Sequence, residues 1–349
     1  MDTLTYCLSN KELEIRDVFK YLYQSVYGCE HLVKDGAGVL ARIEEERAFA
    51  EEDTLPELEP LGGDFARLHL KILNRGLSAR TLCRLFTLSA REKKGDETEL
   101  ILALLRLEDY AKKGQIPFSA DAVENAVKQW QTEGYAPCHH SEHFRATCHP
   151  AYRVIHKKYI PLLPLLIAID KALAERERVT VAIDGRCAAG KTTAAGLLQE
   201  IYGCTVFHMD DFFLRPEQRT PERFAEPGGN VDRERFRAEV LDPLTAGKEV
   251  AYRRYDCHTQ SVCEPIYVSP ARLTVTEGVY ALHPDLRDFY DIKAFMDITP
   301  DLQKERIEKR NPAMANRFFT EWIPMEETYF RTFAVRDLCD VILKQTGER

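Results

Sequence analysis

The sequence lacks an excess of positive charge. Its 349 residues include 48 lysines and arginines against 56 aspartates and glutamates, which gives a formal net charge of −8. Residues 1–149 and 150–349 are each acidic on balance. A domain that binds nucleic acid through its phosphates usually carries a basic surplus. We therefore expect no nucleic-acid partner.

Long apolar runs are also scarce. The longest, IPLLPLLIAI at 160–169, contains two prolines and is too short to span a bilayer. The first residues, MDTLTYCLSNKELEIRD, are too polar for a secretory signal. The ten cysteines are scattered along the chain, so free thiols in a reducing compartment are expected. These features predict a cytoplasmic protein without membrane association.

The pattern of apolar residues changes near residue 176. Before this point, apolar residues recur at the helical spacings of three and four over 11–28, 38–52, 78–92, 97–114 and 120–134. The segment 150–178 is also interpreted as a helix with a proline-disturbed start, whereas 65–73 is ambiguous. We predict a mainly α-helical domain over residues 1–175.

After residue 176, short β-rich runs alternate with helical stretches. The predicted strands are 178–185, 204–210, 271–277, 291–298 and 339–344. Helices are expected between them at 190–202, 232–241 and 300–310. This alternation is typical of βαβ units. Residues 176–349 are therefore predicted to form an α/β domain of the P-loop NTPase kind, with a parallel sheet and flanking helices.

A phosphate-binding motif lies at the start of this second domain. GRCAAGKT at 185–192 matches G-x-x-x-x-G-K-[ST] between a predicted strand and a predicted helix. Its glycines permit a loop whose N–H groups surround a phosphate. Lys191 is expected to reach the β- and γ-phosphates of ATP, and the Thr192 hydroxyl to ligate Mg²⁺. The predicted nucleotide-binding set is Gly185, Arg186, Cys187, Ala188, Ala189, Gly190, Lys191, Thr192 and Thr193.

The motif alone indicates only nucleoside triphosphate binding. The sequence has no N-K-x-D, the base reader expected of a guanine-specific switch protein. The candidate Walker-B strand, in LTVTEGVY, has the single acid Glu277 at its end. A motor ATPase would be expected to carry two acids there.

A pair of aspartates follows the second predicted strand, in HMDDFFL at 208–214. The carboxyl edge of an open α/β sheet is where ligands bind. Asp210 can accept a proton from an attacking hydroxyl, and Asp211 can bind Mg²⁺ through water. In the alternative interpretation, the aspartates cap the next helix and the phenylalanines belong to the core.

These motifs, with YRRYD at 252–256 and TEGVY at 276–280, resemble the uridine kinase / phosphoribulokinase group of P-loop kinases over about residues 176–349. The resemblance implies that Asp210 is the acceptor-hydroxyl base and that Glu277 helps to hold Mg²⁺. It implies that Tyr255, Asp256 and Gln260 lie on the acceptor side. Asp211 and Phe212 are predicted there because the two aspartates and the aromatics that follow suit a site with a carboxylate and a planar wall for a ligand. The resemblance further implies a lid over the triphosphate formed by Arg306, Arg310 and Arg317, with Arg310 acting in catalysis beside Lys191.

The sequence departs from the family at two places. Gln260 stands where uridine kinases carry a pyrimidine-reading histidine, and His258 comes two positions earlier. The segment 215–236 is longer and more basic than in a plain nucleoside kinase. Its arginines either face an anionic acceptor, such as a sugar phosphate, or solvate a loop.

A dense group of cysteines and histidines lies in the first domain, between residues 138 and 149: Cys138, His139, His140, His143, Cys148 and His149. Three interpretations remain open, namely a zinc site, a polar hinge or ligand pocket, and a helix-capping turn. The spacing matches no zinc finger, knuckle or H-E-x-x-H helix. HSEHFR followed by PAYR resembles a helical region found beside uridine-kinase-like domains in some bacterial proteins, which implies only the domain pairing.

The function predicted from these observations is ATP- and Mg²⁺-dependent transfer of the γ-phosphoryl group. The acceptor is expected to be a hydroxyl of a small molecule such as a nucleoside, ribosyl compound or related metabolite. The alternative is an ATP-binding regulatory or sensor protein whose helical domain binds a partner. The sequence leaves a homo-oligomer open.

Overall fold

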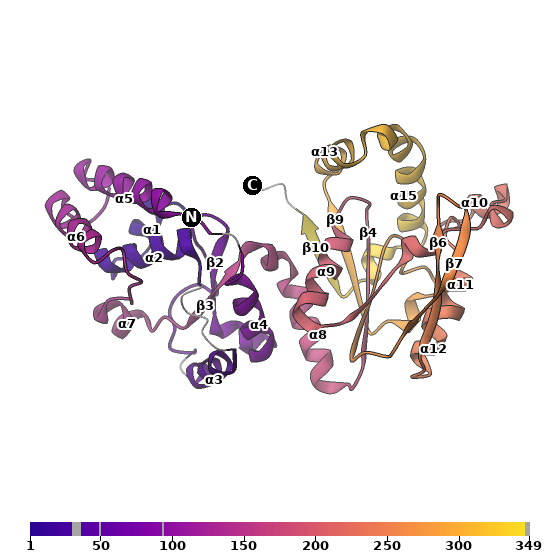
Figure 1. Ribbon diagram of the computed structural model, residues 1–349, viewed down its shortest axis with the longest axis horizontal. Helices are drawn as coiled ribbons and strands as arrows, with labels where there is room; N and C mark the ends of the chain where they lie inside the picture. The colour runs from indigo at the N-terminus through magenta and orange to yellow at the C-terminus, as the bar shows by residue number, and fades with distance from the viewer. Residues whose placement is uncertain (30–35, 49, 93, 346–349) are drawn as a thin grey trace. The chain divides into compact units, whose positions relative to one another are not determined.

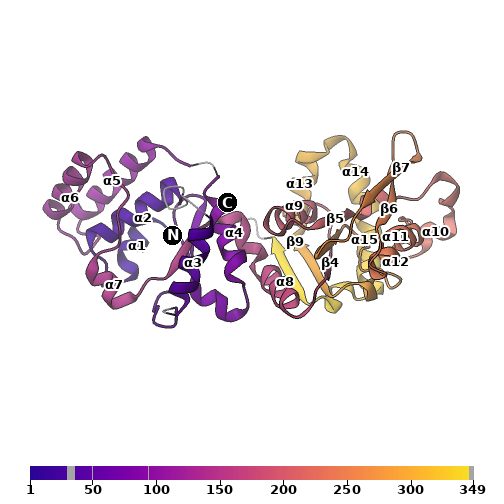
Figure 2. The same ribbon diagram turned by 60° about the horizontal axis from the view of Figure 1, so that its bottom comes forward.

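A computed structural model describes residues 1–29, 36–48, 50–92 and 94–345 (Figures 1 and 2). The chain divides into two units, Met1–Ile160 and Pro161–Arg349. The division lies earlier than residue 175 because helix α8 (Leu163–Glu175) packs on strands of the second unit. None of the described helices is long and apolar enough to cross a bilayer.

The first unit combines helices with a small antiparallel sheet. Its helices are α1 (Thr3–Ser9), α2 (Ile15–Tyr27), α3 (Gly36–Arg47), α4 (Ala79–Ser89), α5 (Glu97–Lys112), α6 (Ala120–Thr132) and α7 (Glu142–Cys148). Its sheet has the order β1 (Leu58–Pro60), β2 (Phe65–His69), β3 (Tyr152–His156). Two 3-10 helices, η2 (Leu70–Arg75) and η3 (Lys157–Leu162), follow β2 and β3.

Strand β3 corrects the prediction of one long helix over 150–178. Residues 152–156 pair in antiparallel register with β2, so that Phe65 faces His156 and Arg67 faces Val154. The apolar composition of the segment fits a buried strand as well as a helix, and a pairing partner more than 80 residues away in the chain decides between them. The same pairing resolves the ambiguous segment 65–73 into β2 and η2.

A buried polar network crosses the first unit from β2. Arg67 is fully buried and donates hydrogen bonds to Gln24 Oε1, at 2.8 Å, and to Glu59 Oε1 and Oε2, both at 3.1 Å. His69, two residues along the same strand face, lies with Nδ1 2.5 Å from Asp53 Oδ2. Buried charges persist where they are paired and hydrogen-bonded. This network therefore fixes how β2 packs against α2.

The second unit is built on a five-stranded parallel sheet of order β10-β9-β4-β8-β5. The strands are β4 (Val179–Gly185), β5 (Thr205–His208), β8 (Leu273–Glu277), β9 (Ile292–Ile298) and β10 (Val341–Gln345). This confirms the predicted α/β fold of the P-loop NTPase kind. Parallel sheets are covered on both faces, which explains the near-continuous burial of β4 and β8.

Helices and shorter helical turns surround this sheet. The α-helices after α8 are α9 (Lys191–Tyr202), α10 (Pro221–Ala225), α11 (Arg233–Phe236), α12 (Asp242–Thr245), α13 (Pro300–Arg310), α14 (Ala315–Arg317) and α15 (Ile323–Thr332). The 3-10 helices are η4 (Met209–Phe212), η5 (Pro216–Gln218), η7 (Arg287–Phe289), η8 (Pro312–Met314) and η10 (Val335–Leu338). Two π-helices are η6 (Arg237–Leu241) and η9 (Phe318–Trp322).

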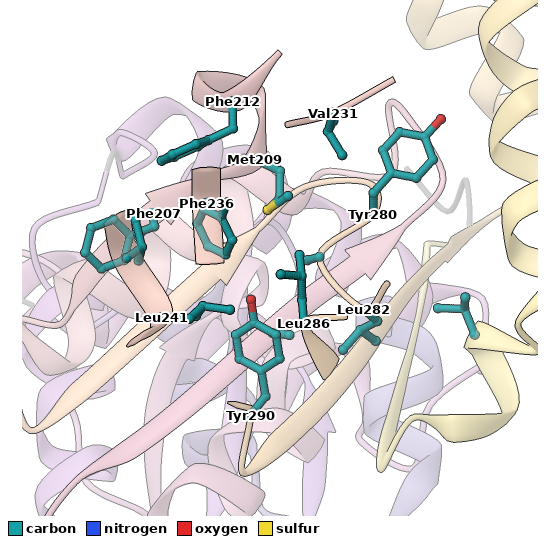
Figure 3. Packing of buried hydrophobic residues seen from close by; sticks show 14 of the residues in the cluster. Phe207, Met209, Phe212, Val231, Phe236, Leu241, Tyr280, Leu282, Leu286 and Tyr290 are labelled. Carbon is teal, nitrogen blue, oxygen red and sulfur yellow. The ribbon is translucent and has the colours of Figure 1, made fainter. Parts of the chain in front are cut away.

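An antiparallel hairpin, β6 (Val250–Asp256) and β7 (Ser261–Val268), was not predicted as a pair of strands. Its inner side joins, through Tyr252, a large apolar cluster. The cluster also contains Phe207, Phe212 and Phe236 (Figure 3). The packing of these rings fixes the carboxyl end of β5, where the paired aspartates lie.

All ten cysteines are free. Cys257 and Cys263, on the β6–β7 hairpin, are exposed, whereas Cys187 of the phosphate-binding loop is buried. This agrees with the expectation of free thiols.

Candidate functional site

The phosphate-binding loop joins the end of β4 to the start of α9. Gly185 has φ +132°, and a Cβ at this position would lie 2.2 Å from the carbonyl oxygen of Met296. Gly190 has φ +92° and caps α9. Ala188 adopts φ +58° between them. These backbone angles wrap the loop around the N-terminus of a twelve-residue helix, which favours an anion.

Lys191 lies inside the loop. Its Nζ donates to the carbonyl oxygens of Gly185, at 2.7 Å, and Arg186, at 3.0 Å, and its exposed fraction is 8%. The ammonium charge is therefore held where the predicted phosphates would enter. Contact with a β- or γ-phosphate requires this group to exchange its carbonyl partners for phosphate oxygens.

Thr192 and Glu277 meet at the ends of α9 and β8. The Thr192 hydroxyl donates to Glu277 Oε1 at 3.1 Å. Two ligands of an octahedral Mg²⁺ at about 2.1 Å lie about 3 Å apart when they are adjacent, so this spacing fits one hard cation. Within the described residues there is no group of three His, Cys, Asp or Glu side chains that could hold a metal by itself. A magnesium ion here would thus need oxygens from nucleotide and water as well.

His208 is a third member of this group, and the sequence interpretation gave it no role. It faces Glu277 in the parallel register of β5 and β8, with Nδ1 2.6 Å from Oε1. The hydrogen bond that His208 donates to Glu277 is the main cause of a raised pKa for His208, against a smaller opposing effect of burial. Its position as the last residue of a strand ahead of two aspartates was the available signal.

The two neighbouring aspartates differ in their surroundings. Asp211 is ion-paired with Arg254 at 3.3 Å. Among the described residues, no side chain or N–H bonds to the carboxylate of Asp210. Asp210 reaches solvent, but the dense protein around it and then the charge of Glu277 raise the pKa of its carboxyl. Of the pair, Asp210 has the carboxylate available for an acceptor hydroxyl.

Phe212 lies in the core and not on the acceptor side. It is fully buried and packs edge-on against Phe236, with 4.9 Å between the ring centroids (Figure 3). The Arg235 guanidinium lies over its ring, 4.3 Å from the centroid. The prediction that Phe212 contacts an acceptor is therefore corrected. The ring lies in the apolar cluster because burying a large aromatic side chain is more favourable than leaving it exposed at an acceptor site.

The hairpin residues of the YD motif are mainly structural in this conformation. Tyr255 is buried and its hydroxyl accepts a hydrogen bond from Arg219 at 2.6 Å. Asp256 Oδ1 accepts from the N–H of His258 at 2.7 Å and so shapes the hairpin turn. Gln260, at φ +53°, is exposed and lines a groove of about 690 Å³ with Arg215, Asp232, Arg235, Glu239, Arg253 and others.

The arginines of 215–236 are mostly engaged within the unit. Arg223 pairs with Glu234 at 2.7 Å and donates to the carbonyl oxygen of Gly229 at 2.9 Å. Arg233 pairs with Asp285 at 2.8 Å and Glu226 at 2.9 Å. These contacts hold the segment in place and reduce the positive charge that it offers to an anionic acceptor.

Of the three predicted lid arginines, one contacts the loop. Arg306 Nη1 donates to the carbonyl oxygen of Ala188 at 3.1 Å. Arg317 instead pairs with Glu321 at 2.8 Å and lies over the Trp322 ring. Arg310, the last residue of α13, is exposed. The structure thus places Arg306 at the loop, whereas Arg310 lies exposed at the end of α13 and Arg317 contacts Glu321 and Trp322.

Several residues that hold the loop were not predicted. Asp184 is fully buried, and its carboxylate accepts hydrogen bonds from the N–H groups of Gly185, Tyr280 and Leu282 and from the Tyr329 hydroxyl, at 2.7, 3.3, 2.9 and 2.8 Å. Apart from Gly185, its partners lie about a hundred residues or more away, so the sequence around the loop carried no signal for them. Arg186 is similarly held by Glu327 and Asp297.

The cysteines and histidines at 138–149 bind separate partners. His140 lies with Nδ1 2.7 Å from Asp17 Oδ1 and Nε2 2.8 Å from the Tyr152 hydroxyl. Burial lowers the pKa of His140 to about 4, so it is neutral at pH 7. His143 pairs instead with Glu12 at 2.7 Å. Over the described part of the chain, these side chains form no metal-binding group.

No protein-family model and no curated protein matches the chain. Solved structures similar to it include a possible uridine kinase of Bacillus stearothermophilus, with 23% identity over 50% of this chain and 96% of that one, at a TM-score of 0.38. Another is a protein of Silicibacter sp. TM1040 assigned as a fructose transport system kinase, with 20% identity over 50% of this chain and 97% of that one, at a TM-score of 0.41. At TM-scores this low, the similarity carries no information about the acceptor.

Proposed function

We propose that the protein is an ATP- and Mg²⁺-dependent kinase that phosphorylates a hydroxyl of a small molecule such as a nucleoside, ribosyl compound or related metabolite. The observation that carries the proposal is the carboxylate of Asp210, to which no described side chain or N–H group bonds. Asp210 lies at the same carboxyl edge of the sheet as the phosphate-binding loop. It is close enough to Lys191 and Glu277 for both charges to act on the pKa of its carboxyl. A protein that only senses a nucleotide has no need of such a base.

The residues of the second unit divide the proposed reaction among them. The loop N–H groups and Lys191 hold the phosphates, as helix N-termini and lysines do in other phosphate sites. Thr192 and Glu277 supply oxygens to Mg²⁺, which neutralises phosphate charge when bound. Asp210 accepts the proton of the acceptor hydroxyl while the hydroxyl oxygen of the acceptor bonds to the γ-phosphorus. The bond from that phosphorus to the bridging oxygen breaks, and ADP leaves.

The charge around the groove favours an uncharged acceptor. The arginines that line the groove, Arg215, Arg235 and Arg253, are paired with its carboxylates, Glu217, Asp232 and Glu239. Gln260 offers amide donor and acceptor groups at the groove wall. These features support a polyhydroxylated, uncharged molecule over a phosphorylated one.

The test is a panel of nucleosides, sugars and sugar phosphates incubated with Mg²⁺-ATP, with ADP release as the measurement. We expect at least one uncharged compound to stimulate ADP release in the wild type and not in Asp210→Asn. ATP binding without acceptor-stimulated release across the panel would favour the nucleotide-sensor alternative.

A further inference from the structure

Helix α15 contacts the phosphate-binding loop through two adjacent glutamates, Glu326 and Glu327. Glu326 Oε2 accepts a hydrogen bond from the N–H of Cys187 at 3.0 Å. The neighbouring Glu327 accepts from Arg186 Nε at 2.7 Å. One turn of this helix thus holds two successive loop residues through two carboxylates. These carboxylates place negative charge in the loop that is expected to bind the negatively charged phosphates of a nucleotide.

Glu326 is the deeper of these two carboxylates. Its exposed fraction is 6%, whereas the Glu327 side chain is 33% exposed. The charged and titratable groups that face it are Lys191 and Cys187 of the loop, Asp184 at the end of β4, and Tyr280 from the segment after β8. Burial is the main cause that raises the pKa of Glu326 to about 7, against the opposing effects of Lys191 and the Cys187 N–H.

A phosphate and this carboxylate compete for the same surroundings. Both are anions, and both are stabilised by the loop N–H groups and by the Lys191 ammonium. Two like charges in one poorly solvated site repel strongly, and protonation of a carboxyl removes the repulsion.

We propose that Glu326 is a proton-coupled positioning residue of the loop, whose carboxylate holds the Cys187 N–H until nucleotide phosphates bind and accepts a proton from solvent as they do. This inference rests on the proposed function, because it requires the loop to bind a nucleoside triphosphate. The proton bonds to a Glu326 carboxylate oxygen, no covalent bond is broken in the protein, and the N–H of Cys187 becomes available to the ligand.

The proposal fixes how nucleotide affinity depends on pH. With a pKa of about 7, about a tenth of the Glu326 side chains are protonated at pH 8. If only that fraction binds phosphates well, the apparent affinity at pH 8 is about tenfold below that of the protonated form. Glu326→Gln keeps the shape of the side chain but carries no charge that repels phosphates, so it is expected to bind the nucleotide about tenfold more tightly than wild type at pH 8 and equally at pH 6.

The test is calorimetric titration of the full chain with the β,γ-imido analogue of ATP and Mg²⁺, at pH 8, in buffers of different ionisation enthalpy. The dependence of the measured heat on buffer gives the number of protons taken up per nucleotide. Wild type is expected to take up close to one proton more than Glu326→Gln, and the subtraction removes any proton released by the nucleotide itself. Glu305→Gln, on the exposed face of α13, makes the same charge change away from the loop and should behave as wild type.

The outcomes separate the two proposals. Nucleotide binding with equal proton uptake by wild type and Glu326→Gln would overturn the role of Glu326 and leave the kinase proposal intact. A wild-type affinity that does not fall between pH 7 and pH 8.5 would overturn it without any reliance on the Glu326 variant. Absence of nucleotide binding in all variants would overturn both proposals.

Discussion

The Nδ1 of His208 lies 2.6 Å from Oε1 of Glu277, the same oxygen that accepts the hydrogen bond of Thr192. One carboxylate oxygen therefore links the end of β5 to the first turn of α9. A side chain that bonds to a metal ligand orients it and sets its basicity. His208 is accordingly expected to control how well Glu277 serves a magnesium ion.

We predict that His208→Ala lowers the affinity of the site for Mg²⁺ without unfolding the chain. Loss of a side chain behind a metal ligand typically costs about 10–100-fold in metal affinity. The Mg²⁺ concentration at half-maximal ADP release should rise by a factor in this range. An unchanged Mg²⁺ dependence would show that Glu277 is oriented by Thr192 alone.

We predict that Asp210→Asn loses turnover and keeps nucleotide binding. The amide retains the shape of the carboxylate but cannot accept the hydroxyl proton, and removal of a general base costs about 10²–10⁴ in rate. ADP release and nucleotide affinity, measured on the same sample, check this. The matched variant Asp211→Asn removes the partner of Arg254 and should reduce the rate less. The reverse order would move the base to Asp211.

Lys191→Ala is expected to lower turnover by about 10²–10³-fold, the usual effect of removing one donor that stabilises charge in a transition state. The fold should persist, since the backbone of the loop is held by Asp184 and by the angles of Gly185 and Gly190. ADP release and circular dichroism measure the two effects. Lys309→Ala, on the exposed end of α13, is the control. Near-normal release by Lys191→Ala would contradict the assignment of the active site.

Gly185 and Gly196 offer a matched test of loop geometry. Gly185→Ala forces a Cβ to within 2.2 Å of the Met296 carbonyl oxygen at φ +132° and should destabilise the fold by at least about 2 kcal/mol. Gly196→Ala, in the middle of α9 with nothing within 4 Å, should stabilise it by about 0.5–1 kcal/mol. Denaturant unfolding measures both. Similar unfolding midpoints for the two variants would mean that the loop relaxes around the new methyl group.

In the first unit, Arg67→Met is expected to cost about 3–5 kcal/mol of unfolding free energy, because it leaves Glu59 buried without its cation. Arg75→Met breaks an exposed pair with Glu57 at 2.7 Å and should cost less than about 1 kcal/mol. Thermal unfolding of the two variants side by side checks the difference. Equal costs would show that the Arg67 network adds no stability beyond that of a surface ion pair.

The strands of the second unit could be predicted because each buried parallel strand is a short apolar run bounded by turn residues. All five predicted runs contain the observed strands β4, β5, β8, β9 and β10, apart from one residue at the end of β10. The loop could be predicted for a local reason, since its glycines and Lys191 are contiguous. The hairpin β6–β7 could not, because its mixture of arginines and aromatics has no clean alternation and a register shift lies between Arg253 and Tyr255.

The side chains that hold the loop could not be found from local sequence. Glu326 contacts a residue 139 positions earlier, and Tyr329 one 145 positions earlier. Phe212 shows the opposite difficulty: its neighbours in sequence suggested a ligand wall, whereas distant rings draw it into the core. Local motifs identify the chemistry, but the partners that orient it come from tertiary packing.

The distribution of thiols has a practical consequence. Burial raises the pKa of Cys187 to about 12, which protects the loop from alkylating reagents, while Cys257 and Cys263 are exposed on either side of the hairpin turn. The protein packed around it also raises the pKa of the exposed Cys257, so mildly alkaline conditions suit its modification. A maleimide fluorophore would consequently attach to the wild-type chain beside Gln260 and leave the nucleotide loop unmodified. Its emission would then report movement of the hairpin when an acceptor is added, with no cysteine introduced or removed.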